Sequence, residues 1–189
     1  MLFVFQGLIE MSNQKQLEEN FLKHRFKDFK WINPQRIMVS EWVRMKCMFG
    51  CGEYGKNASC PPNAPSVNEC RSLFREYSEG VVFHFEKKLE RPEERHEWAK
   101  HINERLLRLE REVFLAGNPK VFLLFMDSCN ICENCIDEGS KCKNKMSARP
   151  TPEAMAIDVF STVRQFGYPI EVLCDYSKTM NRYAFLLVE

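Results

Sequence analysis

The sequence lacks the features that mark a membrane protein or a nucleic-acid-binding protein. No run of about eighteen consecutive apolar residues occurs, so a membrane-spanning helix is not expected. The 27 basic and 26 acidic residues leave a net charge of +1, without the basic excess of a nucleic-acid surface. The sequence also shows no repeat, low-complexity linker, phosphate-binding loop, dinucleotide fingerprint or Ser-His-Asp arrangement.

The beginning of the chain lacks the pattern of a secretory leader. Residues 1–9 are largely apolar, but no basic residue precedes them and no small-residue cleavage site follows. We therefore expect a reducing, cytoplasmic location, where clustered cysteines indicate metal binding or catalysis. Because Met11 could equally open the chain, we interpret residues 1–12 as an N-terminal extension and residues 13–189 as a single α/β metal-binding domain.

Nine cysteines are present, and seven of them lie in two short segments. Cys129, Cys132 and Cys135 form C-x2-C-x2-C, and Cys142 follows after a gap of six residues. The total is odd, and cysteines so close in sequence cannot readily pair with one another, so a disulfide framework is not expected. A thiolate at every third residue instead allows one loop to wrap a single ion or cluster.

The later cysteine segment favours iron–sulfur over zinc. Its first three cysteines have the spacing of the bacterial ferredoxin run C-x2-C-x2-C-x3-C-P, although the gap to Cys142 is longer. Structural zinc sites usually hold their C-x2-C pairs well apart. We expect a 4Fe-4S cluster on Cys129, Cys132, Cys135 and Cys142, with zinc as the alternative. Four bases in the same loop would stabilise the thiolates: Lys141, Lys143, Lys145 and Arg149.

The earlier segment contains Cys47, Cys51 and Cys60, which we expect to hold a separate metal centre. Three glycines among them suit tight wrapping of the backbone: Gly50, Gly52 and Gly55. Cys70 could be a fourth ligand, but it lies in phase with apolar residues of a predicted helix and is better interpreted as a buried core thiol. The centre would then keep an open or non-cysteine position, which a catalytic metal requires. Cys174 is expected in the core.

The apolar periodicity predicts alternating helices and strands. We expect helices at 14–29, 66–78, 92–116 and 151–166, and strands at 37–45, 81–85, 121–125, 170–173 and 183–188. A capping box at Ser66 and Glu69 begins the second helix, Pro92 and Gly117 delimit the third, and Gly167 closes the fourth. The alternation indicates an α/β fold, with helices flanking a mixed β-sheet and both cysteine-rich loops at strand ends. The last strand is a candidate for the sheet edge.

Two segments carry a resemblance to a known family. The first is VRMKCMFGCGEYGK at 43–56 with SCPPNAP at 59–65, and the second is the later cysteine run with RPTPEAMAID at 149–158. From about residue 31 to 188, the chain resembles a family of uncharacterised prokaryotic proteins described as predicted metal-binding, with a domain of unknown function. The resemblance implies a cysteine-held metal, iron–sulfur in kind, without an established reaction. Ala156 stands where the family has glycine.

These observations predict a cytoplasmic iron–sulfur protein with a redox or electron-transfer role. The alternatives are a zinc-stabilised interaction module and an enzyme with an open metal position. Two iron–sulfur centres would form a short electron path, which needs a donor and an acceptor. We expect an acidic redox partner, such as a ferredoxin or flavodoxin, to dock over Lys141, Lys143 and Lys145. Partners of the nucleic-acid or membrane kind are not expected.

Overall fold

The computed structural model describes residues 2–133, 135, 142–175 and 178–189, with side chains from residue 13 onward. The helices are α1 (Leu2–Lys23), α2 (Glu41–Gly50), α3 (Val67–Arg75), α4 (Glu94–Leu115) and α5 (Val159–Gln165), with a 3-10 helix η1 (Pro34–Arg36). The strands are β1 (Phe29–Ile32), β2 (Gly80–Lys87), β3 (Phe122–Leu124) and β4 (Met180–Leu187). Within the described residues, none of the helices is both long and apolar enough to span a membrane.

The four described strands form one sheet in the order β1-β2-β4-β3. This arrangement confirms the α/β class. Every pairing is antiparallel, however, so the expectation of mixed strand direction was wrong. Strand β4 pairs with β2 along its whole length and with β3 at residues 185–187. It is therefore central and not an edge strand, in keeping with the continuous apolar run that a strand buried on both faces shows.

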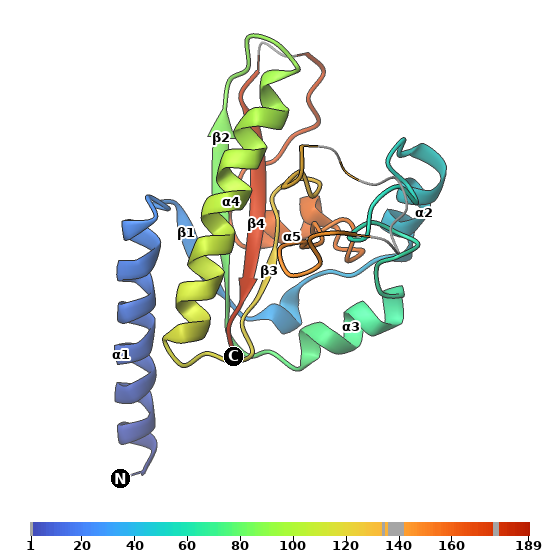
Figure 1. Cartoon of the computed structure of the whole chain (residues 1–189). Coiled ribbons are helices and arrows are strands. Elements are labelled where there is room, and N and C mark those ends of the chain that lie inside the picture. The colour runs from blue at the N-terminus through green and yellow to red at the C-terminus, as the bar shows by residue number, and fades with distance from the viewer. Residues whose placement is uncertain (1, 134, 136–141, 176–177) are drawn as a thin grey trace.

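Helices cover both faces of the sheet (Figure 1). On one face, Phe21 of α1 and Leu106 of α4 pack against Phe83 of β2 in a fully buried cluster. On the other face, Phe74 of α3 and Val163 of α5 share a second cluster with sheet residues. The apolar residues of β4 alternate between the two clusters, because successive side chains of a strand point to opposite faces. The sheet thus forms the middle layer of three.

Several local signals gave correct element ends. Ser66 Oγ accepts the Glu69 N–H at 3.3 Å and Glu69 Oε2 accepts the Ser66 N–H at 2.7 Å, which completes the capping box. Gly117 and Gly167 adopt φ of +99° and +76° just after α4 and α5, a conformation that glycine tolerates best. The first helix ends at Lys23, earlier than expected, because Arg25 turns the backbone at φ +59°.

The segment before the first cysteine group is a helix, where a strand was expected at 37–45. Only a bridge between Val39 and Ile157 has strand character there, and α2 begins after Ser40. Within α2 only Val43 is buried, so the helix lies mostly on the surface. The first cysteine group therefore begins in the last turn of a helix, not at a strand end.

The segment at 151–158 is a series of turns, and α5 begins only at Val159. Its N-cap is Asp158, whose Oδ1 accepts the Ser161 N–H at 3.0 Å. Ala156, two residues earlier, has φ +57° and is fully buried. A left-handed residue cannot continue a right-handed helix, so the predicted start at Thr151 was wrong. Residues 170–173 form no strand either.

The positive φ of Ala156 gives a physical reason for a glycine at this position. An alanine in the left-handed region costs about 1–2 kcal/mol in backbone energy, and glycine removes this cost while adding unfolded-chain entropy worth about 0.4–1 kcal/mol. We expect Ala156→Gly to raise the free energy of unfolding by roughly 0.5–1 kcal/mol, measured by urea denaturation. The reverse kind of change at Gly167, to alanine, is the control and should destabilise. A loss of stability in Ala156→Gly would contradict the strain argument.

Candidate functional site

The earlier cysteine group lies at the C-terminal end of α2 and in the loop that follows. Cys47 is in the last turn of the helix, Cys51 is its C-cap, and Cys60 lies in the loop. Burial raises the pKa of the Cys60 thiol to about 11, and the negative charges of Cys51 and Cys47 contribute to the rise. Burial and Cys51 likewise raise the pKa of Cys47. The three thiols are therefore close enough to act on one another electrostatically.

The loop between Cys51 and Cys60 is held by its own backbone and by Asn57. The Gly55 N–H donates to Pro61 O at 2.8 Å, and Gly55 has φ +80°. The buried Asn57 accepts from the Ser59 N–H and hydroxyl, both at 3.1 Å. Of the three glycines in this segment, Gly55 is therefore the one whose conformation the loop requires, whereas a Cβ at the other two would meet open space.

A cation that sequence reasoning left without a role lies beside this group. Arg44 Nη2 donates to Pro65 O at 2.7 Å and to Ala154 O at 3.0 Å, so it joins α2 to the segment after the loop and to the turns before α5. Its positive charge lowers the pKa of Cys47 against the larger effect of burial. Arg44 is thus the base that would offset thiolate charge at the first group.

The later cysteine group follows β3 and its neighbouring residues. Burial raises the pKa of Cys129, and backbone hydrogen bonds from Ile131 and Arg149 act in the opposite direction. The charges of Cys142 and Cys132 contribute to the rise. Cys135 is exposed, and a hydrogen bond runs from Asn144 Nδ2 to Cys132 Sγ at 3.0 Å.

The sequence suggested that Arg149 would stabilise the thiolates of this loop, but its guanidinium is paired elsewhere. Its Nε and Nη2 donate to the Glu110 carboxylate at 2.9–3.0 Å, and Nη1 donates to Met146 O and Ala148 O. Glu110 is 6% exposed and also accepts the Leu123 N–H at 3.0 Å. Arg149 therefore fastens the end of the loop to α4 and β3. Lys143 and Lys145 are exposed, and Lys141 lies outside the described residues.

Within the described residues, neither group forms a closed cage. Among the residues that the structure describes, no three His, Cys, Asp or Glu side chains are close enough to hold a metal ion together. Neighbouring thiolates repel one another, and in many small metal sites the bound metal supplies the energy that draws its ligands together. The assignment of the seven cysteines as ligands therefore stays a prediction.

The remaining cysteines fall outside these groups. Cys70 is fully buried on α3, and its Sγ lies 3.7 Å from Pro65 O, which confirms the core interpretation. Cys174 is exposed, so its predicted core position was wrong; the segment before it does not join the sheet. His84 has both ring nitrogens hydrogen bonded, to Asp28 and Asn181, as expected for a structural histidine.

The two cysteine-containing loops share one cleft of about 570 Å³. Ala58, Ser59 and Pro65 line it from the first loop, and Lys145 and Ala148 line it from the second. Figure 1 shows both loops on the same side of the sheet, next to α2. Segments about 90 residues apart in the sequence thus meet in one region of the molecule.

Sequence reasoning missed three polar residues: Glu110 and Asn144, which contact the second cysteine loop, and Arg182 of β4. Glu110 carried a readable signal, because it follows Leu109 in the apolar stripe of α4, where an acidic residue must be buried or paired. Asn144 carried none, since an asparagine in a polar loop is ordinary. Arg182 sits in a strand whose other residues are largely apolar, and a charged residue there indicates a buried partner or a ligand.

Comparison with known proteins supports the metal-binding interpretation. A search of curated proteins and a search of solved structures each found no match to this chain. The model of the family described as "Predicted metal-binding protein (DUF2284)" matches residues 30–188, a range that contains both cysteine groups and all four strands except the first residue of β1. The chain therefore belongs to this predicted metal-binding family.

Proposed function

We propose that the protein is an iron–sulfur protein with a redox role, and that its later cysteine group holds a 4Fe-4S cluster. The proposal is carried by the gathering of Cys129, Cys132 and Cys142 in one loop with N–H donors directed at sulfur. Hydrogen bonds to cluster sulfurs are one of the means by which a protein sets the reduction potential. The C-x2-C-x2-C spacing supports iron–sulfur over zinc for the same residues.

The residues present fit such a group in their chemistry. Four thiolates are the ligand number of a 4Fe-4S cluster, and Cys129, Cys132, Cys135 and Cys142 would supply them. The backbone of Ile131 and Arg149 and the amide of Asn144 donate to sulfur, which offsets negative charge on the thiolates. The Arg149–Glu110 pair holds the end of the loop to the rigid part of the fold. A cluster bound here would supply one-electron transfer.

Metal analysis of anaerobically purified protein tests the proposal. We expect a brown protein with broad visible absorption, containing iron and acid-labile sulfide in similar amounts. The Cys129→Ala variant should lose this absorption, whereas the Cys174→Ala variant, which changes an exposed cysteine outside both groups, should keep it. Colourless protein that contains stoichiometric zinc, after growth with iron available, would refute the iron–sulfur proposal and favour the zinc module.

A further inference from the structure

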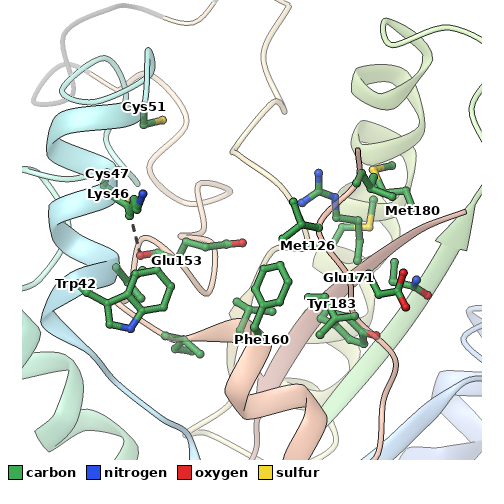
Figure 2. A pocket seen from close by; sticks show the side chains of 18 residues that line it. Trp42, Lys46, Cys47, Cys51, Met126, Glu153, Phe160, Glu171, Met180 and Tyr183 are labelled. Atoms are coloured by element: carbon green, nitrogen blue, oxygen red, sulfur yellow. Dashed lines mark hydrogen bonds between the residues drawn. The ribbon is translucent and has the colours of Figure 1, made fainter. Parts of the chain in front are cut away.

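A cavity of about 530 Å³ lies beside the first cysteine group. Figure 2 shows Trp42, Cys47 and Cys51 on one side of it, Met126 and Tyr183 on the other, and Phe160 near its base. Its volume is within the range of small-molecule sites, which are mostly apolar with a few converging polar groups. The cavity combines residues from α2, α5 and β4 with the 170–173 segment.

The cavity exists because β3 is short. Strand β3 pairs with β4 only at residues 185–187, and Phe125 then turns away to hydrogen bond with Pro150. No described strand pairs with the same edge of β4 at residues 180–184. Four consecutive residues of this edge, 180–183, line the cavity. An edge reached by both odd and even residues brings side chains from both faces of the sheet to one site.

Four charged residues line the cavity, and Arg182 is the least exposed of them. Lys46, Glu153 and Glu171 are all exposed. The Nε of Arg182 is buried and has no hydrogen-bond partner among the described residues. Burial lowers the pKa of Arg182, and the positive charge of Arg95 lowers it further. A buried N–H without a partner costs free energy, which an acceptor bound at this site would offset.

The nearest buried carboxylate is already occupied. Asp127 accepts two hydrogen bonds from Arg95, at 2.6 Å from Nε and 2.8 Å from Nη2. Planar bidentate pairing of this kind uses both oxygens of the carboxylate. Asp127 attracts Arg182 as well, but two guanidiniums face one buried carboxylate. Glu153, an exposed residue of the same lining, also attracts Arg182, and Arg182 Nε remains without a hydrogen-bond partner among the described residues.

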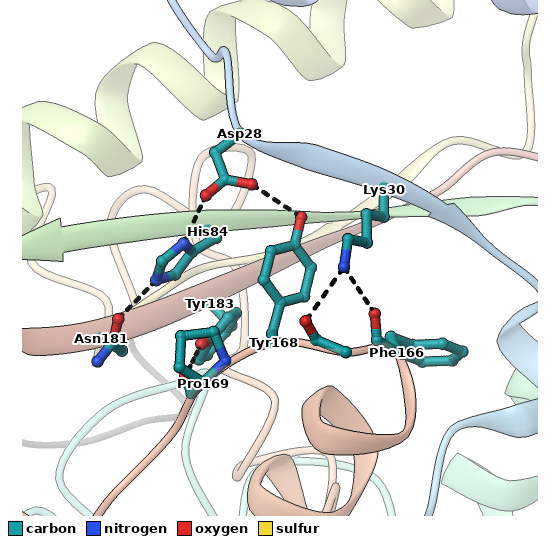
Figure 3. Close-up of polar contacts among 9 residues, drawn as sticks. Asp28, Lys30, His84, Phe166, Tyr168, Pro169, Asn181 and Tyr183 are labelled. Carbon is teal, nitrogen blue, oxygen red and sulfur yellow. Dashed lines mark hydrogen bonds and ion pairs between the residues drawn. The ribbon is translucent and has the colours of Figure 1, made fainter.

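Asn181 places an amide next to Arg182. Figure 3 shows its oxygen directed at His84, whose Nε2 lies 2.7 Å away, while His84 Nδ1 lies 2.6 Å from Asp28 Oδ2. Asp28 also accepts from the Tyr168 hydroxyl at 3.1 Å. This chain of contacts fixes the Asn181 side chain at the cavity wall. Asn181 and Arg182 are successive residues of β4, so their side chains leave opposite faces of the strand, and Arg182 is the cationic donor of its side of the cavity.

We propose that this cavity binds a small organic carboxylate with an apolar body, whose carboxylate pairs with Arg182. The apolar body would lie against Trp42, Phe160 and Met126, and the ligand would occupy the space between the sheet edge and the first cysteine group. The proposal goes beyond the metal-binding function and does not depend on which metal the cysteines hold. It names the chemical class of a ligand that would lie next to Cys47 and Cys51, the two cysteines of the first group that line the cavity.

Calorimetric titration of anaerobically purified protein tests the site, with phenylacetate and octanoate as probes and their primary amides as matched neutral controls. We expect each acid to bind at least about tenfold more tightly than its amide, because a hydrogen bond between two charged groups is stronger than one between a charged group and a neutral amide. Metal content is measured on the same samples, so a failure of the iron–sulfur proposal and a failure of this one are read separately. Equal binding of acid and amide, or binding of neither, would overturn the carboxylate site.

Two variants separate the polar end from the apolar end of the cavity. Arg182→Met should weaken acid binding about tenfold or more and leave amide binding within twofold, whereas Phe160→Ala should weaken both probes alike. Arg111→Met, which removes an exposed arginine of α4, is the control and should change neither. A tenfold acid preference that persists in folded Arg182→Met would show that another group binds the carboxylate and would refute the assignment. If Arg182→Met does not fold, the wild-type preference for acid over amide decides the matter.

Discussion

Arg149→Met is expected to lower the free energy of unfolding by about 3–5 kcal/mol, since it leaves a buried carboxylate without its partner. Glu110 is 6% exposed and keeps only the Leu123 N–H as a hydrogen-bond donor in this variant. The substitution also removes the hydrogen bonds that Arg149 donates to two carbonyls of the second cysteine loop. Chemical denaturation monitored by circular dichroism measures the loss.

The size of this effect depends on burial, so an exposed pair provides the control. Lys23 and Glu112 are 3.1 Å apart, with side chains 67% and 34% exposed, and Lys23→Met should cost less than about 1 kcal/mol. The double variant Arg149→Met with Glu110→Gln should recover much of the stability, because the neutral amide oxygen can still accept from Leu123. An Arg149→Met protein as stable as the Lys23→Met protein would show that the pair does not anchor the loop.

The parts of the fold that could be predicted from the sequence are those set by local chemistry. The capping box at Ser66 and the glycines after α4 and α5 involve neighbours in the chain, and the structure has them where they were expected. The segment at 37–45 was misread because its β-branched and aromatic residues suit a strand, while the choice of helix depends on what lies beside it. Ala156 hid the break before α5, since alanine gives no signal of a positive φ.

The candidate site divides in the same way. The cysteine groups are visible in the sequence because ligand spacing is short-range, and Cys70 could be set apart by its helical phase. The carboxylate cavity was not predictable, because it brings together Trp42, Phe160 and Arg182 from segments far apart in the chain. The cavity also depends on the early end of β3. The residue at which a strand ends is decided by tertiary packing, which the sequence does not reveal locally.

The other large effect that we expect is the loss of one metal centre in Cys47→Ser. Cys47, Cys51 and Cys60 act on one another electrostatically at the end of α2, and serine is a much poorer ligand than a thiolate for iron or zinc. Metal content per chain should fall by one centre, while the visible spectrum of the later group stays. Plasma emission analysis and absorption spectroscopy on anaerobic samples measure the two quantities.

Cys70→Ser is the matched control, because it changes a cysteine ten residues from Cys60 that is fully buried in the core. The new hydroxyl can donate to Pro65 O, which the sulfur already faces at 3.7 Å, so we expect a modest loss of stability and full metal content. Loss of metal in Cys70→Ser would make Cys70 the fourth ligand and would close the first centre. Unchanged metal in Cys47→Ser would instead mean that the three thiols hold no metal and are structural or catalytic thiols. Loss in Cys47→Ser alone leaves the first centre with a position that no cysteine fills, on the side where Cys47 and Cys51 border the carboxylate cavity.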